Sequence, residues 1–285
     1  IGAMIDFGPL LEKPWLMLFG AAAQFGIFVT LVLGGLFFDL NDAASIAIIG
    51  AADGPTAIFV ANVLHSKYLG AIMVAAYSYM ALVPIVQPPV IRLITTKKER
   101  LIRMPYTQGK VSKLTKILFP IVVTIVAGIV APASVALVGF LMFGNLLREC
   151  GVLNSLSETA QTALTNLITI VLGLTVASQM TADKFVQIDT LLIMGLGLFA
   201  FVFDTVGGVM FAKLINIFLP EGKKLNPMIG AAGISAFPMS GRVVNQMGLA
   251  EDNQNFLLMY SISVNVSGQI ASVIAGGLIL TLMGV

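Results

Sequence analysis

Five long stretches of this chain carry no charged residue, and each is long enough to cross a lipid bilayer. They are residues 14–38, 68–91, 117–147, 159–182 and 253–285. A membrane-spanning helix needs about 20 predominantly apolar residues. Only 11% of this chain is charged, against about 25% of a soluble domain, so its polar groups cannot cover a water-exposed surface. The sequence therefore predicts an all-α polytopic membrane protein.

Three further apolar stretches each contain or adjoin one ionisable residue. They are residues 43–64, 190–212 and 225–241. Asp53 and Asp204 lie within the first two, and Arg242 directly follows the third. Together these stretches predict about eight membrane segments. The run at 117–147 is overlong and contains Pro132, which predicts either one kinked helix or a helix plus a reentrant piece.

The basic residues are concentrated in one loop. Eight of the 16 lysines and arginines lie between residues 92 and 116, and the positive-inside rule places such a loop in the cytoplasm. We predict a cytoplasmic loop over residues 97–116, which either only sets orientation or also docks a soluble partner, and we expect no nucleic-acid partner. If all eight predicted segments cross the membrane in alternating directions, Lys223 and Lys224 lie on the side of the membrane opposite to the basic loop. Either that count is wrong or one apolar segment is reentrant.

Three short sequences recur in the same order in the two halves of the chain. Residues 16–20, 50–53 and 77–78 resemble residues 192–195, 230–233 and 260–261. An odd number of predicted spans separates the starts of the two copies, which inverts the second relative to the first, as in many secondary transporters. The predicted units are a first repeat over residues 1–96, linking membrane helices over 117–189 and a second, inverted repeat over 190–285.

Helix breakers lie at matching places in the two repeats. They predict broken segments at residues 43–64 and 225–247. In the first, Asp53 suits a helix N-cap and Pro55 a first helical turn, so a helix should restart there. Unwound backbone inside a bilayer is tolerated only where it lines protein or a water-filled cavity. The two breaks should therefore meet at an ion site near the midplane.

Glycines and prolines mark the flexible points of these breaks. The residues expected to act as backbone ligands or hinges are Gly54, Pro55, Gly230 and Gly233. Further interruptions are predicted later in each repeat, at Pro84, Pro88 and Pro89 in the first and at residues 265–269 in the second. Each repeat should thus contain two interrupted spans.

Asp53 is the residue that most strongly indicates function. A carboxyl group inside a membrane costs several kcal/mol and is a functional candidate by default, whereas Ser or Asn would cap a helix with less desolvation. Sodium is a hard cation that prefers oxygen ligands. The candidate sodium ligands are Asp53, Thr56, Asn226, Ser235 and Asn265. None is His or Cys, so a zinc or copper site is not expected.

Three other polar residues in the apolar segments leave alternatives open. Arg242 either snorkels to the interface or pairs with a carboxylate, of Asp53 or of a bound anion. Tyr79 is either a packed ring or a proton or ligand contact. Asp204 either pairs with Arg242, acts at a helix end near Gly207 and Gly208, or binds the ion directly. The candidate catalytic residues are therefore Asp53, Tyr79 and Arg242.

Several of these segments resemble a known family, the beta subunits of the sodium-pumping biotin-dependent decarboxylases that act on oxaloacetate, methylmalonyl-CoA, glutaconyl-CoA or malonate. The matching stretches are 50–59 (GAADGPTAIF), 75–84 (AAYSYMALVP) with QPP at 87–89, 95–100 (TTKKER), 226–235 (NPMIGAAGIS) continuing to Arg242, and 255–259 (NFLLM) followed by Asn265. Together they extend over nearly the whole chain.

The resemblance implies a membrane subunit that receives carboxybiotin, decarboxylates it with consumption of a proton, and exports sodium. Asp53 is then similar to the essential sodium- and proton-binding carboxylate of the family. The further sodium-site residues that the resemblance implies are Asn226, Ser235 and Asn265. Tyr79 is similar to the coupling tyrosine, and Gly230 and Arg242 lie in the same motif.

The resemblance also implies partners. These are a soluble biotin-dependent carboxyltransferase alpha subunit with its biotin carrier and a small single-span gamma- or delta-type membrane subunit, in an oligomeric complex in a bacterial inner membrane. Sodium and carboxybiotin are used, the latter presented by a partner and not attached to this chain. The family carries additional N-terminal membrane segments, and no basic region precedes the first apolar run here, so we expect an N-terminally incomplete chain.

Two rival classes remain open from the sequence. A free-standing sodium/proton antiporter would share the repeats and Asp53 but would exchange ions without decarboxylase subunits. A purely structural membrane anchor would have no need of Asp53, Asn226 and Asn265, and apolar replacements would be tolerated there.

Overall fold

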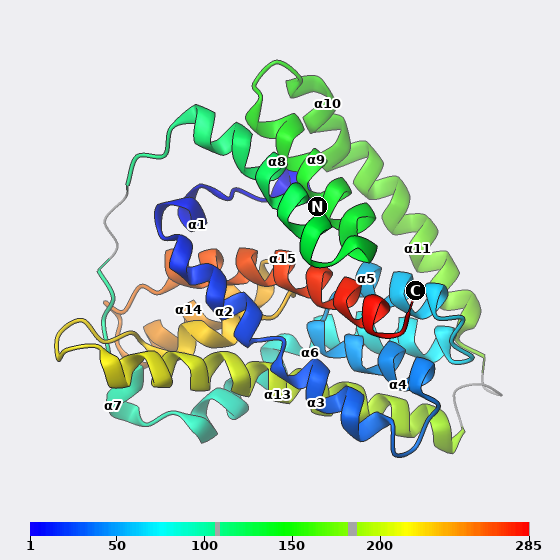
Figure 1. The fold of residues 1–285 in the computed structure, drawn as a ribbon. Helices are drawn as coiled ribbons and strands as arrows, with labels where there is room; N and C mark the ends of the chain where they lie inside the picture. Colours follow the sequence, from blue (N-terminus) through cyan, green and yellow to red (C-terminus); the bar gives the residue numbers. More distant parts are fainter. Residues whose placement is uncertain (106–108, 182–186, 285) are drawn as a thin grey trace.

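The computed structural model describes residues 1–105, 109–181 and 187–284, and over those ranges every regular element is a helix (Figure 1). Six segments of this part of the chain are long and apolar enough to cross a membrane. They are Pro14–Gly34, α6 (Leu69–Ile94), α8 (Lys113–Val130), Asn154–Gln179, α13 (Ile188–Phe218) and α15 (Leu258–Leu282). The predicted all-α polytopic membrane fold is confirmed.

The overlong stretch at 117–147 forms two antiparallel helices. α8 ends before a turn at η4 (Pro132–Ser134), and α9 (Val135–Glu149) runs back along it. Lys116 Nζ lies 3.8 Å from Glu149 Oε2, so this hairpin begins and ends at the same end of the fold. Proline opens the turn because it has no backbone N–H with which to continue α8.

A single long helical segment forms one outer edge of the fold (Figure 1) and packs on α9 and α6. It consists of α10 (Asn154–Thr159), a π-helical turn (Ala160–Leu164) and α11 (Thr165–Gln179). No residue of α11 is buried, and most of its side chains are apolar, which suits contact with lipid. Near the start of the chain, η1 (Gly2–Met4) packs on α9, and α1 (Gly8–Glu12) packs on α15.

The first broken segment is a reentrant hairpin. It consists of α4 (Leu40–Ala47), η3 (Ile48–Ala51) and, after the break, α5 (Gly54–Val63). The Ser66 hydroxyl donates to Asp42 Oδ1 over 2.7 Å, and Lys67 Nζ lies 2.9 Å from Asp39 Oδ2. The chain therefore leaves this segment at the end where it entered, and the segment does not cross the membrane.

The second broken segment is also a reentrant hairpin, and it enters from the basic end. It consists of η6 (Pro227–Gly233) and α14 (Met239–Glu251). At its start, Asn226 Nδ2 donates to the Arg100 carbonyl oxygen over 2.9 Å; at its finish, Arg100 Nε lies 2.7 Å from Glu251 Oε1. Arg100 ends α7 (Lys97–Arg100) in the basic loop, so both ends of this hairpin are fastened to that loop.

Each reentrant hairpin lies between two long helical segments. The first follows η2 (Pro14–Leu16), α2 (Met17–Ala22) and α3 (Phe25–Gly34) and precedes α6; the second follows α13 and precedes α15. Because the hairpins enter from opposite ends, the second unit runs in the reverse direction to the first. This order fits inverted repeats, and the exact repeat boundaries stay a prediction.

The end of α13 lies at the same end of the fold as the basic loop. Lys213 Nζ, in the last turns of α13, lies 3.1 Å from Glu99 Oε1 in α7. Lys223 and Lys224 follow α13 directly, so they lie at the same end as the basic loop. The alternate count of crossings was wrong because it took the α8–α9 hairpin as one span.

Two predicted interruptions are wrong. Pro84, Pro88 and Pro89 lie inside the continuous helix α6, and residues 265–269 lie inside the continuous helix α15. Membrane helices tolerate such residues when neighbouring groups satisfy the freed backbone. The polar run in α15 marks a helix face, not a break.

The fold predicts which loops share a side of the membrane. In a chain whose single cysteine is removed by Cys150→Ser, we expect Lys98→Cys and Lys223→Cys to react with a membrane-impermeant maleimide from one side, and His65→Cys from the other. Comparing right-side-out with inverted vesicles measures this. Reaction of the first two cysteines from opposite sides would contradict the described topology.

Candidate cation site

The two reentrant hairpins meet tip to tip in the interior of the fold. The backbone N–H of Ser235, at the second tip, donates to the carbonyl oxygen of Ala51, at the first, over 3.0 Å. Ala52 has a left-handed backbone with φ of 52°, a conformation that costs a non-glycine residue about 1–2 kcal/mol and ends η3. The predicted meeting of two broken segments is thus a direct backbone contact.

Asp53 caps the helix that leaves the first tip. Its Oδ1 accepts the Thr56 backbone N–H over 3.4 Å, and its Oδ2 accepts the Thr56 hydroxyl over 2.7 Å. α5 begins at Gly54 with Pro55 in its first turn, so the predicted helix restart is observed. The Asp53 side chain is only 8% exposed.

α15 brings further hydroxyl and amide groups to the same place. Ser272 Oγ lies 3.3 Å from Asp53 Oδ2 and 2.8 Å from Ser235 Oγ. Gln269 Nε2 donates to Ser235 Oγ over 2.8 Å. These contacts join both hairpin tips and α15 in one polar group, Asp53, Thr56, Ser235, Gln269 and Ser272, which we call the Asp53 cluster.

The chemistry of the Asp53 cluster suits a small hard cation. It offers carboxylate, hydroxyl and amide oxygens, the ligand type that such cations prefer. Among the described residues, Asp53 forms no ion pair, and no group of three His, Cys, Asp or Glu side chains comes together. A buried carboxylate without a counter-charge costs several kcal/mol. The cluster therefore calls for a bound cation or a proton.

A cavity of about 210 Å³ opens onto the Asp53 cluster from the side of α9. Asp53, Thr56 and Gln269 form its polar part, and its apolar wall includes Leu137 and Phe140. The cavity therefore reaches the polar side chains of the cluster directly.

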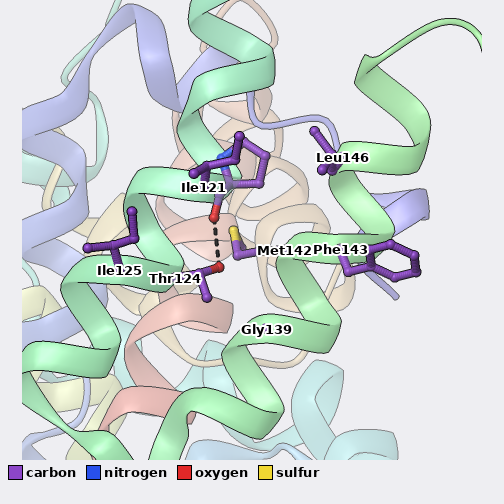
Figure 2. Close-up of a pocket in the computed structure, with 8 residues that line it drawn as sticks. Ile121, Thr124, Ile125, Gly139, Met142, Phe143 and Leu146 are labelled. Atoms are coloured by element: carbon purple, nitrogen blue, oxygen red, sulfur yellow. Dashed lines mark hydrogen bonds between the residues drawn. The ribbon is translucent and has the colours of Figure 1, made fainter.

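A second hollow, between α8 and α9, lacks such chemistry. It measures about 270 Å³. Its lining is Pro120, Ile121, Thr124, Ile125, Gly139, Met142, Phe143 and Leu146. The Thr124 hydroxyl, labelled in Figure 2, donates to the carbonyl oxygen of Pro120 over 2.7 Å. The lining includes no ionisable residue. We therefore place the candidate site at the Asp53 cluster.

Side-chain amides hold the unwound carbonyls of the second tip. Gln87 Nε2, from α6, donates to Ala231 O over 2.8 Å. Asn265 Nδ2, from α15, donates to Ala232 O over 3.1 Å and to Ile234 O over 2.7 Å. These amides replace the hydrogen bonds that the interrupted helix lacks, which an unwound segment in a membrane needs.

The predicted ligands do not all lie in the cluster. Thr56 and Ser235 lie in it, and Asn265 lies one helical turn away, with Oδ1 buried and without a hydrogen-bond partner among the described residues. Asn226 lies apart from it, because both of its Nδ2 contacts are carbonyl oxygens of the basic loop, of Arg100 and Ile102.

The other two candidate catalytic residues also make their contacts elsewhere. The Tyr79 hydroxyl donates to the carbonyl oxygen of Met194 in α13, and its ring is buried. Arg242, in the first turn of α14, is exposed, and no ion pair of its side chain occurs among the described residues. Neither Asp53 nor Asp204 is its partner.

Several residues at the tips were missed by the sequence reasoning. They are Gln24, Tyr77, Gln87, Gln269 and Ser272. The ring of Tyr77 lies against Gly54, where an added Cβ would come within 2.5 Å of it, and Gln24 Nε2 lies 3.5 Å from Gly233 O. A signal existed for Gln269 and Ser272: with Asn265 they repeat at helical spacing along α15, which predicts one polar face.

Gly230 and Gly233, two of the predicted backbone or hinge residues, allow close crossing of backbones. A Cβ at Gly230 would lie 2.0 Å from the Gly208 carbonyl oxygen, and one at Gly233 would lie 2.7 Å from the Phe19 carbonyl oxygen. Neither glycine has a positive φ. Their role is therefore space for α13 and α2 to pass the second tip.

The chain matches, over residues 1–283, the family model described as the Na+-transporting oxaloacetate decarboxylase beta subunit. It belongs to this beta-subunit family. The chain is 52% identical to a probable oxaloacetate decarboxylase beta chain of Vibrio cholerae, with 98% of this chain and 66% of the relative covered. It is 51% identical to the methylmalonyl-CoA decarboxylase subunit beta of Propionigenium modestum, with 100% and 72% covered. The chain thus spans about two thirds of the length of its oxaloacetate relatives.

Two glycine-to-alanine variants test whether the second tip and α13 cross as closely as described. Gly230→Ala should destabilise the fold strongly, because the added methyl would meet the Gly208 backbone. The matched control is Gly195→Ala in α13, where nothing lies within 4 Å of an added Cβ and alanine should stabilise the helix by about 0.5–1 kcal/mol. Thermal unfolding in detergent measures both. Equal unfolding temperatures for the two variants would refute the crossing.

Removal of one amide donor tests how the second tip is held. Gln87→Met keeps the side-chain volume but leaves the Ala231 carbonyl oxygen unsatisfied, so we expect a loss of about 1–3 kcal/mol of stability. Gln161→Met is the control, because Gln161 bonds to the Ser157 hydroxyl in the outer helix and should change stability by less than about 0.5 kcal/mol. Denaturant unfolding compares them, and a neutral Gln87→Met would contradict this role.

Proposed function

We propose that this chain is the membrane subunit of a decarboxylase sodium pump, in which the Asp53 cluster binds the transported sodium ion. The observation that carries the proposal is the cluster itself, a buried carboxylate with hydroxyl oxygens from both hairpin tips and no ion-pair partner among the described residues. Membership of the beta-subunit family supports it. In this role the protein is a translocase.

Sodium and a proton compete for the same carboxylate. Decarboxylation of carboxybiotin breaks the bond between the ring nitrogen and the carboxyl carbon, releases CO2 and leaves a nitrogen that takes up one proton. Two cations cannot share Asp53 cheaply in a buried site, so sodium entry expels the proton that Asp53 holds. The Thr56 and Ser272 hydroxyls, which now donate to Asp53, turn their oxygens to the ion.

The two catalytic candidates outside the cluster take supporting parts in the proposal. Tyr79 links α6 to α13 beside the first tip, where it would transmit a change at Asp53 to the long helices. Arg242 follows the second tip and is exposed, so it is available to a carboxylate of the incoming substrate. Asn226 would act by fixing the second hairpin to the basic loop.

The proposal includes partners at the basic end. A soluble biotin-dependent carboxyltransferase alpha subunit and its biotin carrier would dock on the loop that contains the exposed Lys97 and Lys98, and a small single-span gamma- or delta-type subunit would complete an oligomeric complex. Carboxybiotin would be presented by the carrier and not attached to this chain. The complex would lie in a bacterial inner membrane. A free-standing antiporter is not favoured, since the relatives described above are decarboxylase subunits.

The decisive variant is Asp53→Asn in the assembled complex. We expect it to abolish sodium uptake into proteoliposomes and sodium-dependent decarboxylation, because the amide cannot hold either cation. The matched control is Asp42→Asn. Asp42 is equally buried but bonds to Ser66 and to the Lys67 backbone at the far end of the first hairpin, so both activities should persist. Full sodium-dependent turnover by Asp53→Asn would overturn the proposal.

A further inference from the structure

A second carboxyl group is buried in the middle of α13, away from the Asp53 cluster. The Asp204 side chain has 0% exposure. Its Oδ1 accepts the backbone N–H of Ile27 over 3.1 Å. This N–H lies in the first turn of α3, so a side chain from one long helix caps another. This explains the turn between α2 and α3, where the Pro14–Gly34 segment is interrupted.

The other carboxyl oxygen has no partner. Asp204 Oδ2 is fully buried and receives no hydrogen bond from any described residue. It faces the first hairpin tip, because a Cβ at Gly50 would lie 2.7 Å from it. A cap needs only one acceptor oxygen, so the helix-cap role accounts for Oδ1 and leaves Oδ2 unexplained.

No charged group faces Asp204 from the elements packed against α13. α2, α3, η3 and η6 contain no titratable side chain. α4 contains Asp42, which bonds to Ser66 at the far end of the hairpin. α6 contains three titratable residues: the Tyr77 ring lies against Gly54, and the Tyr79 hydroxyl bonds to the Met194 carbonyl oxygen. The third, Arg92, is exposed near the basic end. Asp204 therefore has no counter-ion among the described residues.

These contacts favour the neutral acid. An ionised carboxylate in this place would leave one charged oxygen without water, donor or cation, which is far less favourable than burying a neutral carboxyl group. Asparagine would cap α3 as well as aspartate and would carry no such penalty. A residue that served only as a cap would have no use for an ionisable group here.

We propose that Asp204 is a second proton-binding site, which holds a proton on Oδ2 while Gly50 of the first hairpin packs against α13. Displacement of that hairpin from α13 would admit water to Oδ2, and the proton would pass to that water. Proton release would thus be tied to the position of the tip that contains Asp53. The bound proton does not depend on the proposed function, whereas its use in coupling rests on it.

The test is infrared spectroscopy on the purified complex, with spectra compared between variants. It detects the C=O stretch of a protonated carboxyl group. In the Asp53→Asn variant at neutral pH we expect one buried protonated-carboxyl band to remain, and we expect Asp204→Asn to lose that band. Asp42→Asn should keep it, because Asp42 already has hydroxyl and backbone donors.

The outcomes separate the proposals. Absence of a protonated-carboxyl band in the Asp53→Asn variant would overturn the proton site, and so would a band that Asp204→Asn leaves unchanged. The first measurement needs no folded Asp204 variant and no decarboxylase activity, so the proton site can stand even if the sodium-pump proposal fails. If Asp204→Asn keeps full sodium uptake, the use of this proton in coupling is refuted.

Discussion

The requirement that every backbone polar group be satisfied inside a membrane governs this structure. Two hairpins break in the interior, and each break frees carbonyl and N–H groups that lipid cannot satisfy. The Ser235 N–H to Ala51 carbonyl bond joins the tips, and amides from α6 and α15 bind the carbonyls of the second tip. The long helices are placed where they can supply these donors.

The same requirement explains the position of the candidate site. An interrupted helix needs a cap, and Asp53 supplies one through Thr56. A second tip arriving from the opposite end brings Ser235, and α15 fills the remaining side with Ser272. The oxygen atoms that satisfy the break are of the type that binds a hard cation. In the proposed function, structural necessity and ion binding therefore use the same residues.

Sequence patterns were sufficient for the features that depend on local chemistry. Uncharged runs gave the long helices, and the Asp53-Gly54-Pro55 sequence predicted the cap and restart of α5. They failed where the outcome depends on neighbours. Pro84 and Gly268 lie in intact helices because packing compensates for them. In residues 117–147, Pro132 marked the interruption, but only the fold shows that the chain there turns back on itself. Asn226 shares a motif with Ser235 but bonds to the basic loop, a distinction that requires the tertiary fold.

The central claim is that both hairpin tips contribute to one sodium site. A double-mutant cycle on sodium affinity tests it, with Thr56→Val in the first hairpin, Ser235→Ala in the second and both together, each measured by calorimetric titration of the assembled complex. Residues that share a ligand couple by about 0.5–3 kcal/mol. We predict a coupling in that range. Effects that add within about 0.3 kcal/mol would show that the two tips do not hold the same ion and would contradict the account.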